Sequence, residues 1–398
     1  RPMLVSRTRR DPTRCPMSGG PLTFTNDVTH WWDASQIYGS SAAQQLKLRT
    51  LQGGKLRLDA RGRLLIEGGA ELTGFVSDAD WAPLSILHTL FAREHNAICD
   101  ALHAAYADWN DDELFGRARL VNAALLVKIH TVEWTSALLP HPTVQASSEL
   151  PGARKSHFHV PYAMTEEFVS VCRLHSLLPD DFTLRALRDH GVLTQCSLPD
   201  LLGDAGVRLI DELGLENLLY SFGVSHPGAL RLHNYPNHLR KLERSDGRRV
   251  DLAAIDVLRD RERGVPRYND LRRLLHLPAV QSFEQLTDDA EWARELRDVY
   301  GDVDRVDLLP GLLAEPRPAG MAFSDTQFRI FMLMASRRLH SDRFYTTDFT
   351  PEVYSPVGMQ WIRDNSLRSV LLRHCPALTP ALAHVENAFA PWNALRLS

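Results

Sequence analysis

Apolar residues recur at three- and four-residue steps along most of the chain, which is the period of an amphipathic α-helix. Two long helices are predicted first, one starting at Pro83 and one running from Asp112 to Leu139. Shorter helices are expected over residues 165–175, 209–219, 252–258, 289–299 and 324–339, with a helical pair over residues 358–389. The pattern therefore predicts a mainly α protein.

Alternation typical of β-structure is confined to one short stretch, residues 54–69. Leu56 and Leu58 alternate there with charged residues, and Arg61-Gly62 supplies a turn. No segment of the sequence separates two regions of different composition. We therefore expect one large helical domain over residues 25–398 with one short β-hairpin, preceded by an irregular basic arm over residues 1–24.

Composition limits the class of protein. The chain is 44% hydrophobic and 24% charged, as soluble globular proteins are, and its net charge of −4 gives no electrostatic case for binding nucleic acid. No apolar run has the length of a transmembrane helix. The five cysteines are odd in number and form no closely spaced pair, which favours a reducing compartment, the cytoplasm, over a disulfide framework.

A candidate metal ligand stands at the end of the helix predicted over residues 165–175. His175 is followed by an apolar corner and then by Asp180-Asp181-Phe182. A neutral imidazole held at a helix end among apolar neighbours suits the proximal side of a haem iron. A structural histidine would leave the same pattern. Cys172, three residues earlier, is either a small buried hydrophobe or a reactive thiol beside a haem.

Alternate positions in the loop before residue 36 carry oxygen donors. They are the Thr29 hydroxyl, the Trp31 carbonyl, the Asp33 carboxylate and the Ser35 hydroxyl. A hard cation such as calcium takes six to eight oxygens, and alternate donors in one curled loop can wrap around it. The alternative is an ordinary turn before a helix, with Asp33 as the cap.

Two further polar groups have more than one interpretation. His130 and Glu133 share a helical face, with Thr135 close by, and form either a patch for a substrate carboxylate or a buried histidine beside a helix salt link. A basic cluster comes later in the chain, at Arg337, Arg338 and Arg343. It is either a solvated helix end or a site for a haem propionate or a substrate acid.

Five strings of residues carry a family resemblance, and they occur at residues 32–40, 90–96, 128–135, 174–180 and 259–269. Together they resemble the peroxidase–cyclooxygenase superfamily of animal-type haem peroxidases, nearest its bacterial members and the plant fatty-acid α-dioxygenases. The resemblance covers the chain from Thr25 onward. It implies a mainly helical haem-peroxidase fold with haem b and calcium as cofactors.

The resemblance also assigns roles to residues. His175 is the implied proximal haem ligand, Asn234 the implied partner of its other ring nitrogen, and Arg173 and Arg338 are assigned to the cofactor site. Cys172 is assigned to the catalytic group. The loop residues Thr29, Trp31, Asp33 and Ser35 match the calcium site of the family. His130 and Thr135 match positions that hold a fatty-acid carboxylate, with Arg343 as their arginine partner.

The sequence departs from the family pattern in three places. A distal histidine followed by aspartate is expected upstream of the calcium loop, but residues 1–28 contain no histidine, and His30 lies within the loop. We therefore expect that pair in a separate or missing N-terminal segment. The catalytic arginine expected near Ser77 has no match. Cys172 stands where cyclooxygenases and α-dioxygenases carry a radical tyrosine.

These features predict a haem-dependent peroxidase that responds to oxidative stress. Such an enzyme reduces hydrogen peroxide or an organic hydroperoxide while it oxidises a small organic or lipid substrate. One alternative is a fatty-acid α-dioxygenase of oxylipin metabolism, which His130, Thr135 and Arg343 favour and Cys172 opposes. The other is a degenerate, non-catalytic relative or fragment, which the missing distal residues favour.

Overall fold

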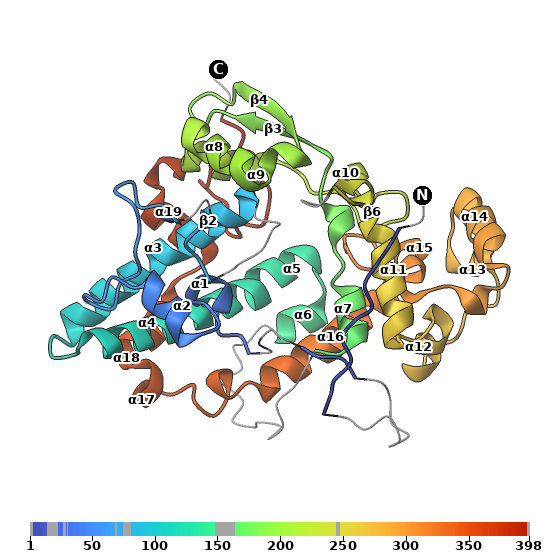
Figure 1. Ribbon diagram of the computed structural model, residues 1–398, viewed down its shortest axis with the longest axis horizontal. Coiled ribbons are helices and arrows are strands. Elements are labelled where there is room, and N and C mark those ends of the chain that lie inside the picture. The colour runs from blue at the N-terminus through green and yellow to red at the C-terminus, as the bar shows by residue number, and fades with distance from the viewer. Residues whose placement is uncertain are drawn as a thin grey trace. The chain divides into compact units, whose positions relative to one another are not determined.

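The computed structural model of the protein describes residues 3–13, 23–26, 29, 31–67, 70–74, 81–147, 164–243 and 247–395. Most of the described elements are α-helices, and the strands are short (Figure 1), so the prediction of a mainly α fold is confirmed. Contacts divide the chain into two compact units. The first unit comprises Arg1–Asp27, Tyr162–Asp180 and Pro227–Arg338, and the second comprises Val28–Pro161, Asp181–His226 and Leu339–Ser398. The boundaries 1–24 and 25–398 stay a prediction.

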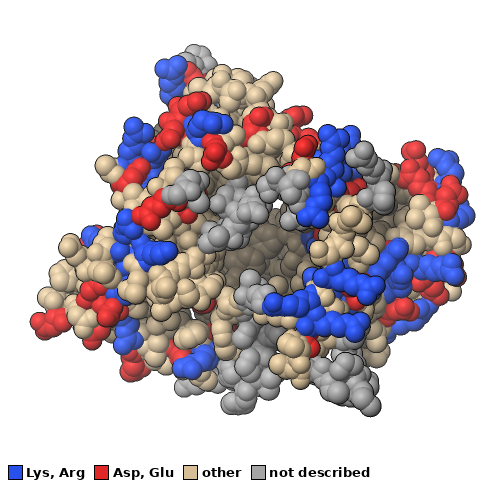
Figure 2. All heavy atoms as spheres, in the orientation of Figure 1, with Lys and Arg blue, Asp and Glu red and all other residues tan. Residues whose placement is uncertain are grey.

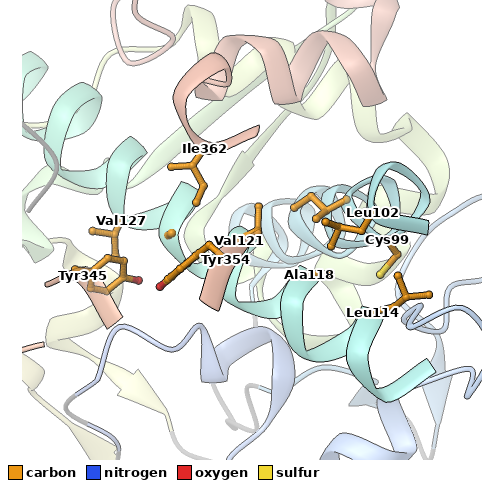
Figure 3. Close-up of a cluster of buried hydrophobic side chains, with 11 residues drawn as sticks. Cys99, Leu102, Leu114, Ala118, Val121, Val127, Tyr345, Tyr354 and Ile362 are labelled. Carbon is orange, nitrogen blue, oxygen red and sulfur yellow. The ribbon is translucent and has the colours of Figure 1, made fainter. Parts of the chain in front are cut away.

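The second unit is built on two long helices, α3 (Ala82–Ala105) and α4 (Asp111–Lys128), which pack along each other. A capping box begins α4: the Asn110 side chain accepts the N–H of Glu113, whose own side chain accepts the N–H of Asn110. Their apolar faces meet α17 (Pro351–Tyr354) and α18 (Pro356–Asp364) in a buried cluster (Figure 3). The cluster consists of Ile98, Cys99, Leu102, Leu114, Ala118, Val121, Ala124, Val127, Tyr345, Tyr354 and Ile362. Each large side chain buried there contributes about 1.5–3 kcal/mol.

The helix predicted from Asp112 to Leu139 is a continuous helical run in three parts. After α4 comes a π-helical segment, Ile129–Trp134, and then α5 (Thr135–Leu138). Lys128, at the junction, donates from Nζ to the carbonyls of Ile362, Arg363 and Asn365 at the end of α18. A cation is stabilised at a helix C-terminus, so this contact fixes α18 to α4.

The remaining elements are short. In the second unit they are α1 (Ser35–Tyr38), α2 (Ala42–Leu48), β1 (Ile66–Glu67), β2 (Ala70–Glu71), α6 (Pro142–Ser147), β3 (Asp181–Arg185), β4 (Val192–Ser197), α8 (Gly203–Leu213), α9 (Leu215–Val224), α19 (Leu367–His374) and 3₁₀ turns at Leu198–Leu201, Arg343–Tyr345 and Pro376–Leu378. The first unit holds α7 (Glu166–Val171), α10 (Asn237–Arg240), β5 (Leu242–Glu243), β6 (Arg249–Val250), α11 (Leu252–Arg263), α12 (Tyr268–Leu274), α13 (Phe283–Leu286), α14 (Ala290–Tyr300), α15 (Leu308–Ala314), most of α16 (Asp325–Ser341) and 3₁₀ turns at His175–Leu177 and Val303–Arg305.

The β-structure differs from the prediction of one hairpin over residues 54–69. The turn at Arg61-Gly62 is present, since the Gly62 N–H donates to the Asp59 carbonyl, but the paired strands are β1 and β2. Two further antiparallel pairs, β3 with β4 and β5 with β6, were not predicted. Because β3 is only five residues long, its alternating pattern is too short to stand out from buried helix in the sequence.

The helix predicted over residues 209–219 is also two helices. Gly214 has φ +82°, a left-handed conformation that ends α8 and lets α9 start in a new direction. The helices predicted over residues 252–258 and 289–299 correspond to α11 and α14. In the part of the chain that the structure describes, no helix combines the length and apolar character needed to cross a membrane.

The described part of the N-terminal arm, residues 3–13 and 23–24, contains no helix, and Arg10 and Phe24 form an isolated antiparallel bridge. It packs within the first unit, where the Thr8 N–H and hydroxyl donate to Glu262 on α11. Around α11, α12 and α14, basic and acidic side chains are interspersed on the visible face (Figure 2). Ion pairs of this unit include Arg259–Glu262, Arg263–Glu166 and Arg273–Asp304. Part of the basic charge of the first unit is therefore compensated locally.

Candidate functional site

His175 lies in the first unit, outside the helix that was predicted to contain it. Helix α7 ends at Val171, and His175 opens the separate 3₁₀ turn His175–Leu177. Cys172, the residue after α7, still donates its N–H to the Phe168 carbonyl, so the helical hydrogen bonding ends three residues before His175. The orientation of His175 therefore depends on this turn and on the residues that hold the turn in place.

The imidazole of His175 is held from one side. Its Nδ1 lies 3.1 Å from the Tyr235 hydroxyl and 3.2 Å from Oδ2 of Asp256. The same hydroxyl lies 3.1 Å from Oδ2 of Asp256, to which it can donate. The side chain of His175 is 31% exposed, and Nε2 has no hydrogen-bond partner among the described residues. One ring nitrogen is therefore fixed, while the other can accept a metal ion.

Asp256 sits in a small buried charge network. It is 1% exposed, and its Oδ1 accepts a hydrogen bond from Nη1 of Arg173. Nε of Arg173 also lies 3.8 Å from Asp260, which accepts from the Ser170 hydroxyl at 2.6 Å. Burial raises the pKa of Asp260 to about 6, although Ser170 and Arg173 oppose the rise. Arg173 is thus engaged with carboxylates of its own unit, and its assignment to the cofactor site stays a prediction.

Asn234 does not bond to the imidazole, which corrects the expected pairing. Its amide nitrogen donates to the carbonyls of Ser176 and Ala229 at 2.9 and 2.8 Å. The Gly228 N–H also donates to the carbonyl of Leu177, and a Cβ on Gly228 would lie only 2.4 Å from the Ser176 oxygen. Asn234 therefore fastens the backbone of the turn that carries His175, while the next residue contacts the ring.

Tyr235 and Asp256 were both missed in the sequence. Tyr235 follows directly after Asn234, the residue chosen for the role. Asp256 lies in the helix predicted over residues 252–258, and Asp260 follows four residues later, so a helix that continues past residue 258 places both carboxylates on one face. That pair was the signal that could have pointed to a charged partner for this unit's histidine.

Cys172 and Arg338 lie in the same unit as His175. The Cys172 side chain is exposed, yet the atoms packed around its sulfur raise the pKa of the thiol to about 11, against the effect of Arg338. The group is therefore a neutral thiol near pH 7. Nη1 of Arg338 lies 3.3 Å from the sulfur of Met164.

The predicted carboxylate-binding residues lie in the second unit, on the π-helical segment. The His130 ring stacks on Trp134 at 4.7 Å between centroids and lies 5.1 Å from the Trp32 ring. The buried Thr135 donates its hydroxyl to the carbonyl of His130 at 2.8 Å. The contacts with Trp134 and Trp32 fix the plane of the His130 ring. The π-helical geometry of the segment that carries the ring is frequent at functional sites.

The Glu133 and Arg343 side chains are engaged with other residues of the second unit. The buried Glu133 carboxylate accepts the N–H of Leu367 and so caps α19, and burial raises its pKa. The Arg343 side chain is 59% exposed and donates from Nε to Asp348 at 2.7 Å. Its predicted role as the arginine partner of His130 therefore stays a prediction.

The predicted calcium loop is held by hydrogen bonds of its own. The Thr29 hydroxyl accepts the N–H of Trp31, and Oδ1 of Asp33 accepts the N–H of Ser35, although the N-cap position of α1 is Ala34 and no side chain caps it. Oδ2 of Asp33 lies 3.5 Å from Nη2 of Arg119. Within the described residues, no group of three or more His, Cys, Asp or Glu side chains is arranged to hold a metal. Calcium stays a prediction, and His30 and Ser77 lie outside the described residues.

Known proteins resemble this chain over nearly its whole length. The profile of the family described as animal haem peroxidase matches residues 1–389. The chain is 40% identical to alpha-dioxygenase PIOX of Oryza sativa subsp. japonica, over 97% of this chain and 69% of that protein. It is 40% identical to alpha-dioxygenase PIOX of Pisum sativum, over 92% of this chain and 64% of that protein. The chain thus spans about two thirds of the length of these relatives.

Solved structures give the same result. A crystal structure of fatty acid alpha-dioxygenase from Oryza sativa matches with a TM-score of 0.89 and 38% identity, over 97% of this chain and 70% of that one. Another structure of the same rice enzyme, a tyrosine-to-phenylalanine variant with palmitic acid, matches with a TM-score of 0.90. Peroxidase A from Dictyostelium discoideum, at 21% identity and a TM-score of 0.81, shares the fold.

Proposed function

The chain belongs to the animal haem peroxidase family, and on that premise we propose that it binds haem b through His175 and acts as an oxidoreductase on a fatty acid. The observation that carries the choice of substrate is the 40% identity to alpha-dioxygenases over 97% of the chain. This favours the α-dioxygenase alternative over the plain peroxidase that the sequence motifs alone predicted.

The geometry around His175 supports a haem ligand at this position. A metal-binding imidazole needs one nitrogen with a free lone pair and a second nitrogen held by a hydrogen bond. His175 has both, since Nδ1 is held by Tyr235 and Asp256 while Nε2 has no described partner. When bound, haem would carry the oxidising equivalents that a peroxide delivers, and the protein fixes the ring that would hold the iron.

The second unit supports a carboxylate-binding role for His130 and Thr135. The His130 ring is held between Trp32 and Trp134, so its orientation is set before a ligand arrives. A ring held in this way can donate a hydrogen bond to a carboxylate at little cost in side-chain entropy. We include Arg343 as the partner that supplies the second donor, with a guanidinium suited to bidentate binding.

Cys172 gives a specific reason to keep peroxidase activity as a second candidate. The position that the resemblance assigns to a hydrogen-abstracting tyrosine carries a thiol here, with its pKa raised to about 11. Peroxide reduction does not need a phenol at that position, whereas oxygenation of a fatty acid needs a side chain that abstracts hydrogen. Cys172 therefore decides between the two activities.

A calcium site completes the proposal. We place calcium at the loop of Thr29, Trp31, Asp33 and Ser35, where four oxygen donors alternate. None of residues 1–28 is a histidine, so none of them takes the distal role that the resemblance implies.

The test is haem titration followed by oxygen uptake on adding palmitic acid. The wild-type chain and His130→Ala should each take up haem in a one-to-one ratio, and His175→Ala should lose at least ten-fold in haem affinity. Palmitic acid should then drive oxygen uptake that falls at least ten-fold in His130→Ala. We expect Cys172→Tyr to increase this uptake.

Two results would decide against fatty-acid oxygenation. If palmitic acid drives no oxygen uptake by the wild-type chain or by Cys172→Tyr, while peroxide-dependent dye oxidation is present, the peroxidase candidate stands instead. If haem binding is unchanged in His175→Ala, the assignment of His175 as the iron ligand is wrong.

A further inference from the structure

The two oxygens beside Nδ1 of His175 restrict how this ring carries its proton. A neutral imidazole has one N–H, and a nitrogen that binds a metal must present its lone pair. With Nε2 as the metal-binding atom, Nδ1 carries the hydrogen. Its acceptors are the Tyr235 hydroxyl at 3.1 Å and Oδ2 of Asp256 at 3.2 Å.

Both routes for this hydrogen bond end on the same carboxylate. Nδ1 can donate directly to Asp256, or it can donate to Tyr235, which donates in turn to Oδ2 of Asp256 at 3.1 Å. The second oxygen of Asp256 is engaged by Arg173, so the carboxylate is fixed at both ends. Asp256 is 1% exposed, which leaves water little part in the interaction.

A buried carboxylate acceptor has a different electronic effect from an amide. It draws the Nδ1 hydrogen more strongly, which raises the basicity of the imidazole and its donation through the other nitrogen. Stronger donation favours the higher oxidation state of a bound metal. The amide nitrogen of Asn234 donates to the carbonyls of Ser176 and Ala229, and a neutral amide oxygen accepts a hydrogen bond less strongly than a carboxylate does.

We propose that Tyr235 and Asp256 are the positioning residues of His175, and that they make it a strongly donating ligand. They fix Nδ1 as the hydrogen-bond donor, orient the ring and stabilise ferric over ferrous haem. The inference rests on the proposed function, in that it takes His175 as the haem ligand. Tyr235, from the segment before α10, and Asp256, from α11, would thus help to set the ferric–ferrous potential of the iron.

The test compares Asp256→Asn and Tyr235→Phe with two further variants. Tyr300→Phe is the matched control, because Tyr300 also donates to a buried carboxylate of the same unit, Asp307, at 3.0 Å. Asn234→Ala tests the amide as the alternative partner. The readouts are haem affinity, the ferric–ferrous midpoint potential and the iron–histidine stretch in resonance Raman spectra.

Asp256→Asn should still bind haem and should lose at least ten-fold of the preference for ferric over ferrous haem. A ten-fold change corresponds to a rise of about 59 mV in the one-electron potential. The iron–histidine stretch should move to lower frequency, since the ligand donates less. Tyr235→Phe should shift in the same direction by less, because the direct contact with Asp256 remains, and Tyr300→Phe should keep the wild-type potential.

Unchanged potentials and stretches in both Asp256→Asn and Tyr235→Phe, with haem still lost in His175→Ala, would overturn the inference and leave the proposed function intact. A shift found in Asn234→Ala alone would also overturn it. NMR of the haem-free protein, isotopically labelled at histidine, tests the hydrogen bond without requiring haem to bind. A slowly exchanging Nδ1–H resonance of His175 that disappears in Asp256→Asn supports the hydrogen bond even if the wild-type chain binds no haem, while a rapidly exchanging Nδ1–H in the wild type counts against it.

Discussion

The Nε2 atom of His374 lies 2.7 Å from Oε2 of Glu94, a carboxylate that is completely buried in the second unit. Glu94, on α3, also accepts from Arg373 and from the indole N–H of Trp361. Three donors from α18 and α19 thus converge on one carboxylate of α3. A buried charge is tolerated only when it is paired in this way, so the contact fixes α18 and α19 on the long helix.

This network predicts a loss of stability in acid. Burial alone would raise the pKa of Glu94, but the hydrogen bonds and charge of His374, Arg373 and Trp361 bring it below its ordinary value of 4.5. A carboxylate whose pKa is lower in the folded than in the unfolded chain stabilises the fold above the unfolded pKa. That stabilisation is lost as the pH falls below 4.5 toward the folded value.

Glu94→Gln should cost about 3 kcal/mol of unfolding free energy at pH 7, because it leaves Arg373 facing a neutral amide. The variant should also lose this carboxylate's part of the acid dependence below pH 4.5. Urea unfolding between pH 3 and pH 7 checks both statements. Equal free energies of unfolding for the variant and the wild type at pH 7 would show that the pair contributes nothing net.

Lys128→Met should destabilise the second unit by about 2 kcal/mol. The ammonium donates to three carbonyls at the end of α18, and a methionine of similar length fills the space without the hydrogen bonds. Lys47→Met, at an exposed position in the last turn of α2, is the matched control and should change the free energy of unfolding by less than about 0.5 kcal/mol. Urea unfolding at pH 7 measures the difference.

Gly228→Ala should weaken haem binding at least ten-fold. The new Cβ would lie 2.4 Å from the Ser176 carbonyl and 2.9 Å from the Asn234 amide, so the turn that begins with His175 must move. Gly116→Ala is the control: it lies in α4 with nothing within 4 Å of the new Cβ and should stabilise the helix by about 0.5–1 kcal/mol without affecting haem. Haem titration by absorbance compares the two, and equal affinities would show that the turn is not what positions the ligand.

The sequence predicted the elements that the spacing of apolar residues within a single segment determines. The spacing from Pro83 and from Asp112 gave α3 and the run that begins with α4, since a long amphipathic pattern is hard to produce by chance. The π-helical segment was not predictable, because a single-residue shift in helical register leaves the apolar spacing almost unchanged. The break at Gly214 depended on a positive φ that the apolar pattern does not report.

The partners of His175 were not predictable for a different reason. Tyr235 lies 60 residues away in sequence, and its contact with the ring exists because α11 packs on α7 and the segment before α10 closes over the turn. The family resemblance implied Asn234, the residue before Tyr235. In the structure the Asn234 amide donates to a backbone carbonyl, and the Tyr235 hydroxyl contacts the His175 ring. The sequence motif thus located the segment around residue 234, but the packing of the unit determines which of its side chains contacts His175.

The last prediction concerns the reactivity of Cys172. With a pKa of about 11, only about one thiol in ten thousand is ionised at pH 7, and thiolate is the form that reacts with iodoacetamide. The rate of alkylation should therefore be low at pH 7 despite the exposed side chain and should rise about ten-fold per pH unit up to pH 10. In urea the same residue should react at least a hundred-fold faster at pH 7, because its pKa returns to about 8.5. Mass spectrometry of the Cys172 peptide follows the reaction, with Cys172→Ser to confirm the assignment, and fast alkylation of the folded chain at pH 7 would mean that the packed atoms do not suppress the thiolate.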